Sequence, residues 1–142
     1  MSVRNSFFSI IFLFIVIPYS YGDTTDYYYV FYNNIKINKY TGINADTLPL
    51  IFKKADIKNS DVLIVKYWDD SPCEKCKFFL VVIDDKKQYV KVVSNTGQGS
   101  PLSVPLAEII EWSKNNDVTM FEVYYYEEKP AFPIHLFKVI LE

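Results

Sequence analysis

Arginine is almost absent from this chain, since only Arg4 occurs among its 142 residues. Beyond residue 22 the charged side chains are 14 Lys and 17 acidic residues, which gives a net charge of −3 with His neutral. Without arginine, this part of the chain has no guanidinium group for bidentate contacts with phosphate or guanine. Its negative balance also repels a polyanion, so the composition argues against nucleic acid as a partner.

The residue types that build metal and catalytic sites are equally scarce. One His, His135, and two Cys are too few for a tetrahedral zinc site, which takes four ligands. The chain has no G-x-S-x-G nucleophile elbow and no D-x-D-x-D-G calcium loop. His135 alternates with the apolar residues of a predicted strand, so we expect a partly buried, structural histidine; pairing with a cysteine thiolate is the catalytic alternative. We expect no metal and no cofactor.

Apolar runs long enough to cross a membrane are also missing. The longest, residues 7–17, falls short of the ~20 residues that a spanning helix needs. A basic residue precedes it, a proline follows it, and small residues stand at positions 20 and 22. This pattern predicts a secretory signal peptide over residues 1–22. We expect a secreted or periplasmic protein whose mature part, residues 23–142, forms one domain without a membrane span.

Most of the mature region has the pattern of β-strands, because β-branched and aromatic residues recur there with a period of two. Asn33 and Asn34 separate the first two segments and favour a two-residue hairpin turn. The segment 77–83 is apolar on both faces, which predicts a central strand covered on both sides. The predicted strands are 26–32, 35–40, 61–68, 77–83, 88–94, 118–126 and 134–141.

One segment has a clear helical pattern. Over residues 103–115, Ser103 is a suitable N-cap, Pro105 falls in the first turn, and apolar residues follow at helical spacing. A shorter helix is predicted across residues 47–55, capped by Asp46. The predicted fold class is α+β: a largely antiparallel sheet of about six to seven strands, with the helix 103–115 packed on one face, in a single domain.

Aromatic residues are plentiful, and two tyrosine triplets occupy predicted strands, at 27–29 and 124–126. Successive strand residues face opposite sides, so we expect at least one ring of each triplet to point to solvent or to a partner. Exposed tyrosines are common contact residues in interfaces. Tyrosine is also a good strand former, so a purely structural interpretation stays open. Tyr124, Tyr125 and Tyr126 are candidate contacts for another protein or an envelope glycan.

The two cysteines form one C-x-x-C motif, Cys73 to Cys76. The motif follows a hydrophobic strand that ends in Tyr67 and Trp68, then a short polar connection, and Lys77 comes directly after it. This arrangement resembles the thioredoxin pattern. The resemblance implies a thiol–disulfide oxidoreductase in which Cys73 is the nucleophile, Cys76 is the resolving thiol and a helix follows the motif. The alternative is a small structural disulfide that pins the turn between two strands.

Three acidic pairs fall in predicted turns: Asp69-Asp70, Asp84-Asp85 and Glu127-Glu128. Paired carboxylates serve glycosidases when they face each other across a cleft, whereas adjacent acids in turns are usually solvated turn formers. A hydrolase is therefore the third hypothesis. The first is a small exported, non-enzymatic binding module with a protein or glycan partner, and the second is the thioredoxin-like oxidoreductase.

Overall fold

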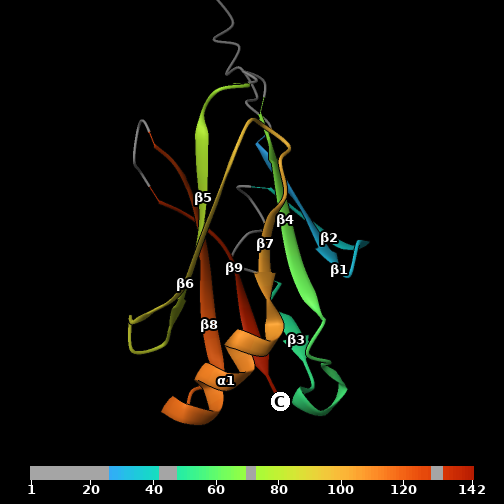
Figure 1. Ribbon diagram of the computed structural model, residues 1–142, viewed down its shortest axis with the longest axis vertical. Coiled ribbons are helices and arrows are strands. Elements are labelled where there is room, and N and C mark those ends of the chain that lie inside the picture. The colour runs from blue at the N-terminus through green and yellow to red at the C-terminus, as the bar shows by residue number, and fades with distance from the viewer. Residues whose placement is uncertain (1–25, 42–47, 70–72, 129–132) are drawn as a thin grey trace, which may run out of the picture.

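The computed structural model describes residues 26–41, 48–69, 73–128 and 133–142, which form two packed β-sheets and one α-helix (Figure 1). The predicted signal peptide, the expected helix cap Asp46, and Asp70 lie outside the described residues. Within them, no helix is long and apolar enough to span a membrane.

The first sheet has four antiparallel strands in the order β2-β1-β4-β7. Asn33 and Asn34 form the turn between β1 and β2, and both have positive φ, 48° and 68°. This confirms the predicted Asn-Asn hairpin. The strands of this sheet are β1 (Tyr27–Tyr32), β2 (Ile35–Thr41), β4 (Val62–Trp68) and β7 (Leu102–Pro105).

The second sheet has five strands in the order β3-β9-β8-β5-β6, and all its pairs are antiparallel except β3 with β9. The prediction of a largely antiparallel arrangement is confirmed, but the prediction of one sheet of six to seven strands is wrong. Alternation shows which residues of a strand share a face, and it does not show which strand is the neighbour. The strands are β3 (Leu50–Phe52), β5 (Lys77–Asp84), β6 (Tyr89–Thr96), β8 (Met120–Glu127) and β9 (Ile134–Leu141).

The core lies between the two sheets and is rich in aromatic rings. Tyr40 of β2 stacks on Phe137 of β9 with ring centroids 4.9 Å apart, and Tyr28 of β1 meets Tyr125 of β8 edge to face at 5.7 Å. All four rings are buried. Each buried large side chain of this kind contributes about 1.5–3 kcal/mol of transfer free energy, so these inter-sheet contacts hold the two layers together.

The helix α1 (Leu106–Asn116) lies at one end of the sandwich and connects β7 of the first sheet to β8 of the second (Figure 1). The predicted start at Ser103 is wrong. Ser103 and Pro105 belong to β7, because residues 102–105 pair with β4 and direct Leu102 and Val104 into the core. Pro105 has an extended backbone, with φ −64° and ψ 121°, and the helix begins after it.

The short helix predicted across residues 47–55 is also wrong. Leu50 to Phe52 form β3, which extends the second sheet by pairing with the end of β9. A single 3₁₀ turn, Lys54–Asp56, follows the strand. The tertiary pairing with β9 therefore decides the conformation of a segment whose local pattern favoured a helix.

The strand predicted at 77–83 exists as β5, and within the described residues its second face is covered only in part. It lies between β8 and the edge strand β6. Phe78, Leu80 and Val82 face the core; on the opposite face Val81 is also buried, whereas Phe79 and Ile83 are half-buried. The second apolar face of β5 is therefore part of the outer surface of the second sheet.

Candidate functional site

Cys73 and Cys76 form a disulfide in the turn that leads into β5, with their Cα atoms 5.4 Å apart. The backbone of the 97–100 loop lies against this turn. The N–H of Gly97 donates to the carbonyl oxygen of Cys76 at 2.9 Å, and the N–H of Gln98 donates to that of Cys73 at 3.1 Å. Both cysteines are half-buried and pack on the core. The disulfide is therefore integrated into the junction between two loops.

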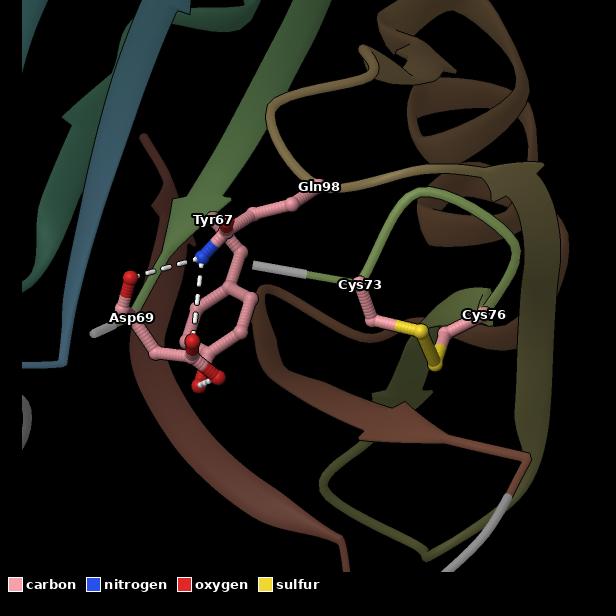
Figure 2. The surroundings of a disulfide bond; sticks show 5 residues. All are labelled: Tyr67, Asp69, Cys73, Cys76 and Gln98. Carbon is pink, nitrogen blue, oxygen red and sulfur yellow. Dashed lines mark hydrogen bonds between the residues drawn. A yellow bond between two sulfur atoms is a disulfide. The ribbon is translucent and has the colours of Figure 1, made fainter. Parts of the chain in front are cut away.

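The side chain of Gln98 extends this junction to the end of β4 (Figure 2). Its Nε2 donates to the carbonyl oxygen and to Oδ1 of Asp69, at 3.0 and 3.2 Å. The Tyr67 hydroxyl donates to Oδ2 of the same carboxylate at 3.0 Å. Asp69 is thus a hydrogen-bonded member of the loop junction, and this geometry assigns it a structural part.

The thioredoxin architecture implied by the C-x-x-C motif is not found. In that architecture the motif opens a helix, whose N-terminus lowers the thiol pKa of the first cysteine. Here β5 begins at Lys77, immediately after Cys76, and pairs with β6 and β8 along its length. No helix N-terminus follows the motif, so the geometry offers no helix dipole to activate Cys73.

A cluster of buried rings lies beside this junction at the same end of the sandwich. Tyr67 contacts Tyr28 and Tyr125 with ring centroids 5.0 and 4.4 Å apart, and Phe78 stacks on Tyr125 at 5.8 Å. Burial, reinforced by nearby carboxylates, raises the pKa of all three tyrosines far above the usual value of 10.0. These hydroxyls therefore stay protonated and do not serve as bases at neutral pH.

The tyrosine triplet of β8 divides between the two faces of its strand. Tyr125 is only 1% exposed and belongs to the buried ring cluster, so it is not available as a surface contact. Tyr124 and Tyr126 are half-buried on the outer face, where Tyr126 stacks on Phe79 with ring centroids 4.9 Å apart. β8 therefore places aromatic side chains both in the core and on the surface.

The outer face of the second sheet carries an open apolar groove of about 330 Å³, which we name the outer groove. Tyr89, at its edge, is 72% exposed. Among the described residues, the lining is made of tyrosine, branched aliphatic and proline side chains, without a charged one. It consists of Val81, Ile83, Tyr89, Tyr124, Tyr126 and Pro133.

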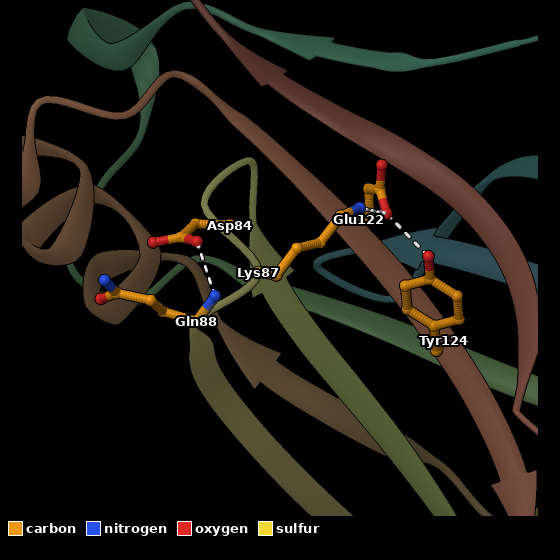
Figure 3. A network of polar contacts seen from close by, with 5 residues as sticks. All are labelled: Asp84, Lys87, Gln88, Glu122 and Tyr124. Atoms are coloured by element: carbon orange, nitrogen blue, oxygen red, sulfur yellow. Dashed lines mark hydrogen bonds and ion pairs between the residues drawn. The ribbon is translucent and has the colours of Figure 1, made fainter.

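A polar network borders the outer groove at Tyr124 (Figure 3). The Tyr124 hydroxyl donates to Oε2 of Glu122 at 2.7 Å, and Nζ of Lys87 lies 2.9 Å from the same oxygen. The hydrogen bond from Lys87, followed by that from Tyr124, lowers the pKa of Glu122. Glu122 therefore remains a carboxylate at neutral pH and fixes the orientation of the Tyr124 ring.

Asp84, at the end of β5, organises the neighbouring turn (Figure 3). Its Oδ1 accepts from the backbone N–H of Gln88 at 2.8 Å, and its Oδ2 accepts from Nε1 of Trp112 in α1 at 3.1 Å. Burial acts to raise the pKa of Asp84, but these hydrogen bonds outweigh it and the pKa is lowered. Asp84, the buried member of the Asp84-Asp85 pair, thus joins α1 to the second sheet.

The remaining described candidates, His135 and Glu127, lie at separate places in the second sheet. His135 of β9 meets the Tyr124 ring edge to face at 5.0 Å, next to the outer groove. Burial, followed by the charges of Asp69 and Asp26, raises the pKa of Glu127. Among the described residues, no group of three or more His, Cys, Asp or Glu side chains is placed to hold a metal ion.

Several groove residues were not predicted from the sequence: Val81, Ile83, Tyr89 and Pro133. A signal for two of them was present in the segment 77–83, whose second face is as apolar as the first. That pattern predicted burial beneath another element. In the folded chain Val81 is buried and Ile83 is half-buried, and both contribute to the groove.

Comparison of the sequence with models of known protein families and with curated proteins finds no match to either.

Proposed function

We propose that this protein is a small exported binding module, without catalysis, that contacts a protein partner through the outer groove. The observation that carries the proposal is the groove itself, an open apolar depression on a sheet face with three tyrosines around it. Apolar depressions with aromatic lining are typical places where a partner inserts an anchoring side chain. Export is proposed on the pattern of residues 1–22.

The lining favours an apolar side chain of a protein over a sugar as the occupant. Sugar sites combine aromatic rings with several polar groups that converge on the hydroxyls. Here the described polar network lies at one end, and its carboxylate already accepts hydrogen bonds from Lys87 and Tyr124. The apolar remainder of the groove suits a branched aliphatic or aromatic side chain.

The experiment is a selection of peptides from a displayed random library on residues 23–142, with a glycan array probed in parallel. Peptides selected on the wild-type protein are expected to bind the Tyr89→Ser/Tyr126→Ser variant at least tenfold more weakly, because one interface tyrosine contributes about 2 kcal/mol. Both substitutions lie on the outer face, so circular dichroism and the melting temperature should show a folded protein.

The matched control is Tyr27→Ser/Tyr29→Ser, which removes two outward tyrosines from the first sheet. It should leave the affinity of the selected peptides within twofold. Equal weakening by both double variants, or selected peptides that are indifferent to the groove variant, would contradict the proposal. Recognition of array glycans in place of peptides, weakened by the groove variant, would replace the protein partner of the groove by a sugar.

A further inference from the structure

The outer face of the first sheet differs from the outer groove of the second sheet, because it combines aromatic side chains with charged ones. Tyr28 and Val30 of β1 are buried, so Tyr27, Tyr29 and Phe31 point outward along the same strand. The rings follow one another with centroids 5.2 and 6.5 Å apart. This sheet therefore presents a line of three aromatic side chains on its surface.

The strand register places lysines on both sides of this line. Tyr29 lies opposite Lys39 of β2 and opposite Lys66 of β4, and Phe31 lies opposite Lys36 of β2. Directly opposite residues of antiparallel strands share a face, so all three ammonium groups belong to the aromatic surface. We call the surface made by Tyr27, Tyr29, Phe31, Lys36, Lys39 and Lys66 the lysine–aromatic face.

The side-chain geometry agrees with the register. Nζ of Lys39 lies 4.5 Å from the centroid of the Tyr27 ring, and Nζ of Lys36 lies 4.8 Å from that of Tyr29. Nζ of Lys66 lies 5.2 Å from the centroid of Phe31. These are cation–π distances, which hold the ammonium groups over the rings in a defined arrangement.

Acidic residues are absent from the paired rows of this face within the described strands. The other outward positions in the register are Thr41, Val62, Ile64, Trp68, Ser103 and Pro105. The two carboxylates that flank β4 are engaged elsewhere: Asp61 accepts from Tyr32 and Asn33, and Asp69 accepts from Tyr67 and Gln98. Asp26, which precedes Tyr27, acts electrostatically on Tyr28, Tyr67 and Glu127 on the inner side of the strand. Among the paired strand residues of this face the described charges are therefore all positive, in a protein of net negative charge.

We propose that the lysine–aromatic face is a second binding surface, specific for an anionic polysaccharide that carries carboxylate or sulfate groups. In the complex the ammonium groups move from the ring faces onto the acid groups of the polysaccharide, and the apolar side of a pyranose ring then stacks on the uncovered tyrosine or phenylalanine. The face is a row on a sheet surface, which suits an extended polymer. This proposal is independent of the outer groove and of its partner.

Polysaccharide is favoured over nucleic acid because the residues beyond position 22 lack arginine and have a net charge of −3. Three lysines neutralise few phosphates, and affinity for nucleic acid depends mainly on the number of phosphates neutralised. The mixture of rings and point charges on this face fits sparse acid groups separated by apolar sugar surfaces.

The experiment measures the binding of residues 23–142 to a polygalacturonate oligosaccharide and to heparin by isothermal titration calorimetry. We expect binding to at least one probe, and a weakening by at least tenfold in the Lys36→Gln/Lys39→Gln/Lys66→Gln variant. Binding should also weaken when NaCl rises from about 50 to about 300 mM, because salt screens exposed charges. A separate Tyr29→Leu variant, which keeps apolar bulk and removes the ring face, should weaken binding several-fold.

The matched control is Lys53→Gln/Lys75→Gln/Lys114→Gln, which makes the same change in net charge at exposed positions outside this face. It should reduce affinity less than twofold. Equal losses in the two triple variants would reduce the effect to net charge and overturn the proposal. Failure of both probes to bind would overturn it too, as would tighter binding to single-stranded DNA or to vesicles containing anionic lipid.

Discussion

Two buried aspartates, Asp61 and Asp84, connect parts of the fold that are distant along the chain. Asp61 accepts hydrogen bonds from the side chains of Tyr32 and Asn33 at the first hairpin, and its carbonyl oxygen accepts from the N–H of Leu106 at the start of α1. Asp84 joins α1 to the second sheet through Trp112. Buried carboxylates are costly unless they are hydrogen-bonded, so both sites depend on their donors being in place.

Replacing Asp84 by alanine should destabilise the protein by about 1–3 kcal/mol, because the partly buried hydrogen bonds from the Gln88 N–H and from Nε1 of Trp112 lose their acceptor. Urea unfolding followed by circular dichroism measures the change. The neighbouring Asp85→Ala is the control, since Asp85 is exposed in the same turn, and its effect should stay within about 0.5 kcal/mol. Similar losses in the two variants would show that the turn, and not the buried contacts, controls stability.

Acid should destabilise the fold through these carboxylates. Hydrogen bonds lower the folded-state pKa of Asp61, Asp84 and Glu122 below the ordinary values of 3.8, 3.8 and 4.5. The unfolded chain therefore binds more protons in acid than the folded one. The stabilisation is complete above about pH 5 and is lost as the pH falls through the lowered folded pKa values.

Urea unfolding of the wild type and of Asp61→Asn, from about pH 7 to about pH 3, tests this dependence. The asparagine variant does not titrate at that position, so its unfolding free energy should fall less steeply in acid. If the unfolding free energies of the two proteins fell in parallel with pH, Asp61 would not contribute to the destabilisation by acid.

At the scale of single elements, the disulfide turn separates the two hypotheses for the C-x-x-C motif. Its loop is short and its backbone is also held by Gly97 and Gln98, so Cys73→Ser/Cys76→Ser should cost about 2 kcal/mol or less and leave the fold intact. The disulfide should also have a reduction potential below about −300 mV, as structural disulfides do.

Equilibration with thiol redox buffers measures the potential, and urea unfolding of the double serine variant measures the stability. A potential between about −120 and −270 mV, the range of working oxidoreductases, would contradict the structural assignment and favour redox chemistry at Cys73.

Local patterns predicted the strands better than their partners. The turn at Asn33 and Asn34 and the strand 134–141 were predicted correctly, because a turn and a period-two alternation depend only on residues close together in the sequence. The split into two sheets was not predicted, since it depends on register between distant strands. The start of α1 was misplaced for the same reason. Ser103 pairs with Ile64 of β4, so the residues before Leu106 form a strand and not the first turn of the helix.

The candidate site was predictable in the same limited way. The alternation of β8 places Tyr125 on the face opposite to Tyr124 and Tyr126, but it did not show which face is buried, so all three were candidates. The groove needs β5, β6 and β8 side by side. The lysine–aromatic face needs the register of β1 with β2 and β4, which places lysines from two other segments next to Tyr29 and Phe31.

For the whole molecule, we predict that export removes residues 1–22. A chain produced in a secreting host with a C-terminal tag should appear outside the cytoplasm with an intact mass that starts at Asp23. The Leu13→Arg variant places a charge in the apolar run and should stay in the cell at full length. Secretion of a chain that keeps Met1, or of both proteins equally, would contradict the signal-peptide prediction.

The order of strands in the second sheet has a consequence for when the fold can form. β9, which comes last among the described strands, lies between β3 and β8, and Leu50 of β3 pairs with Val139. A chain emerging N-terminus first has no partner for β3 until nearly 90 further residues have followed it. Because such non-local pairings form slowly, the sandwich closes only after residue 141 is available. We therefore expect the second sheet to be incomplete during most of the synthesis of the chain, which would suit the export predicted from residues 1–22.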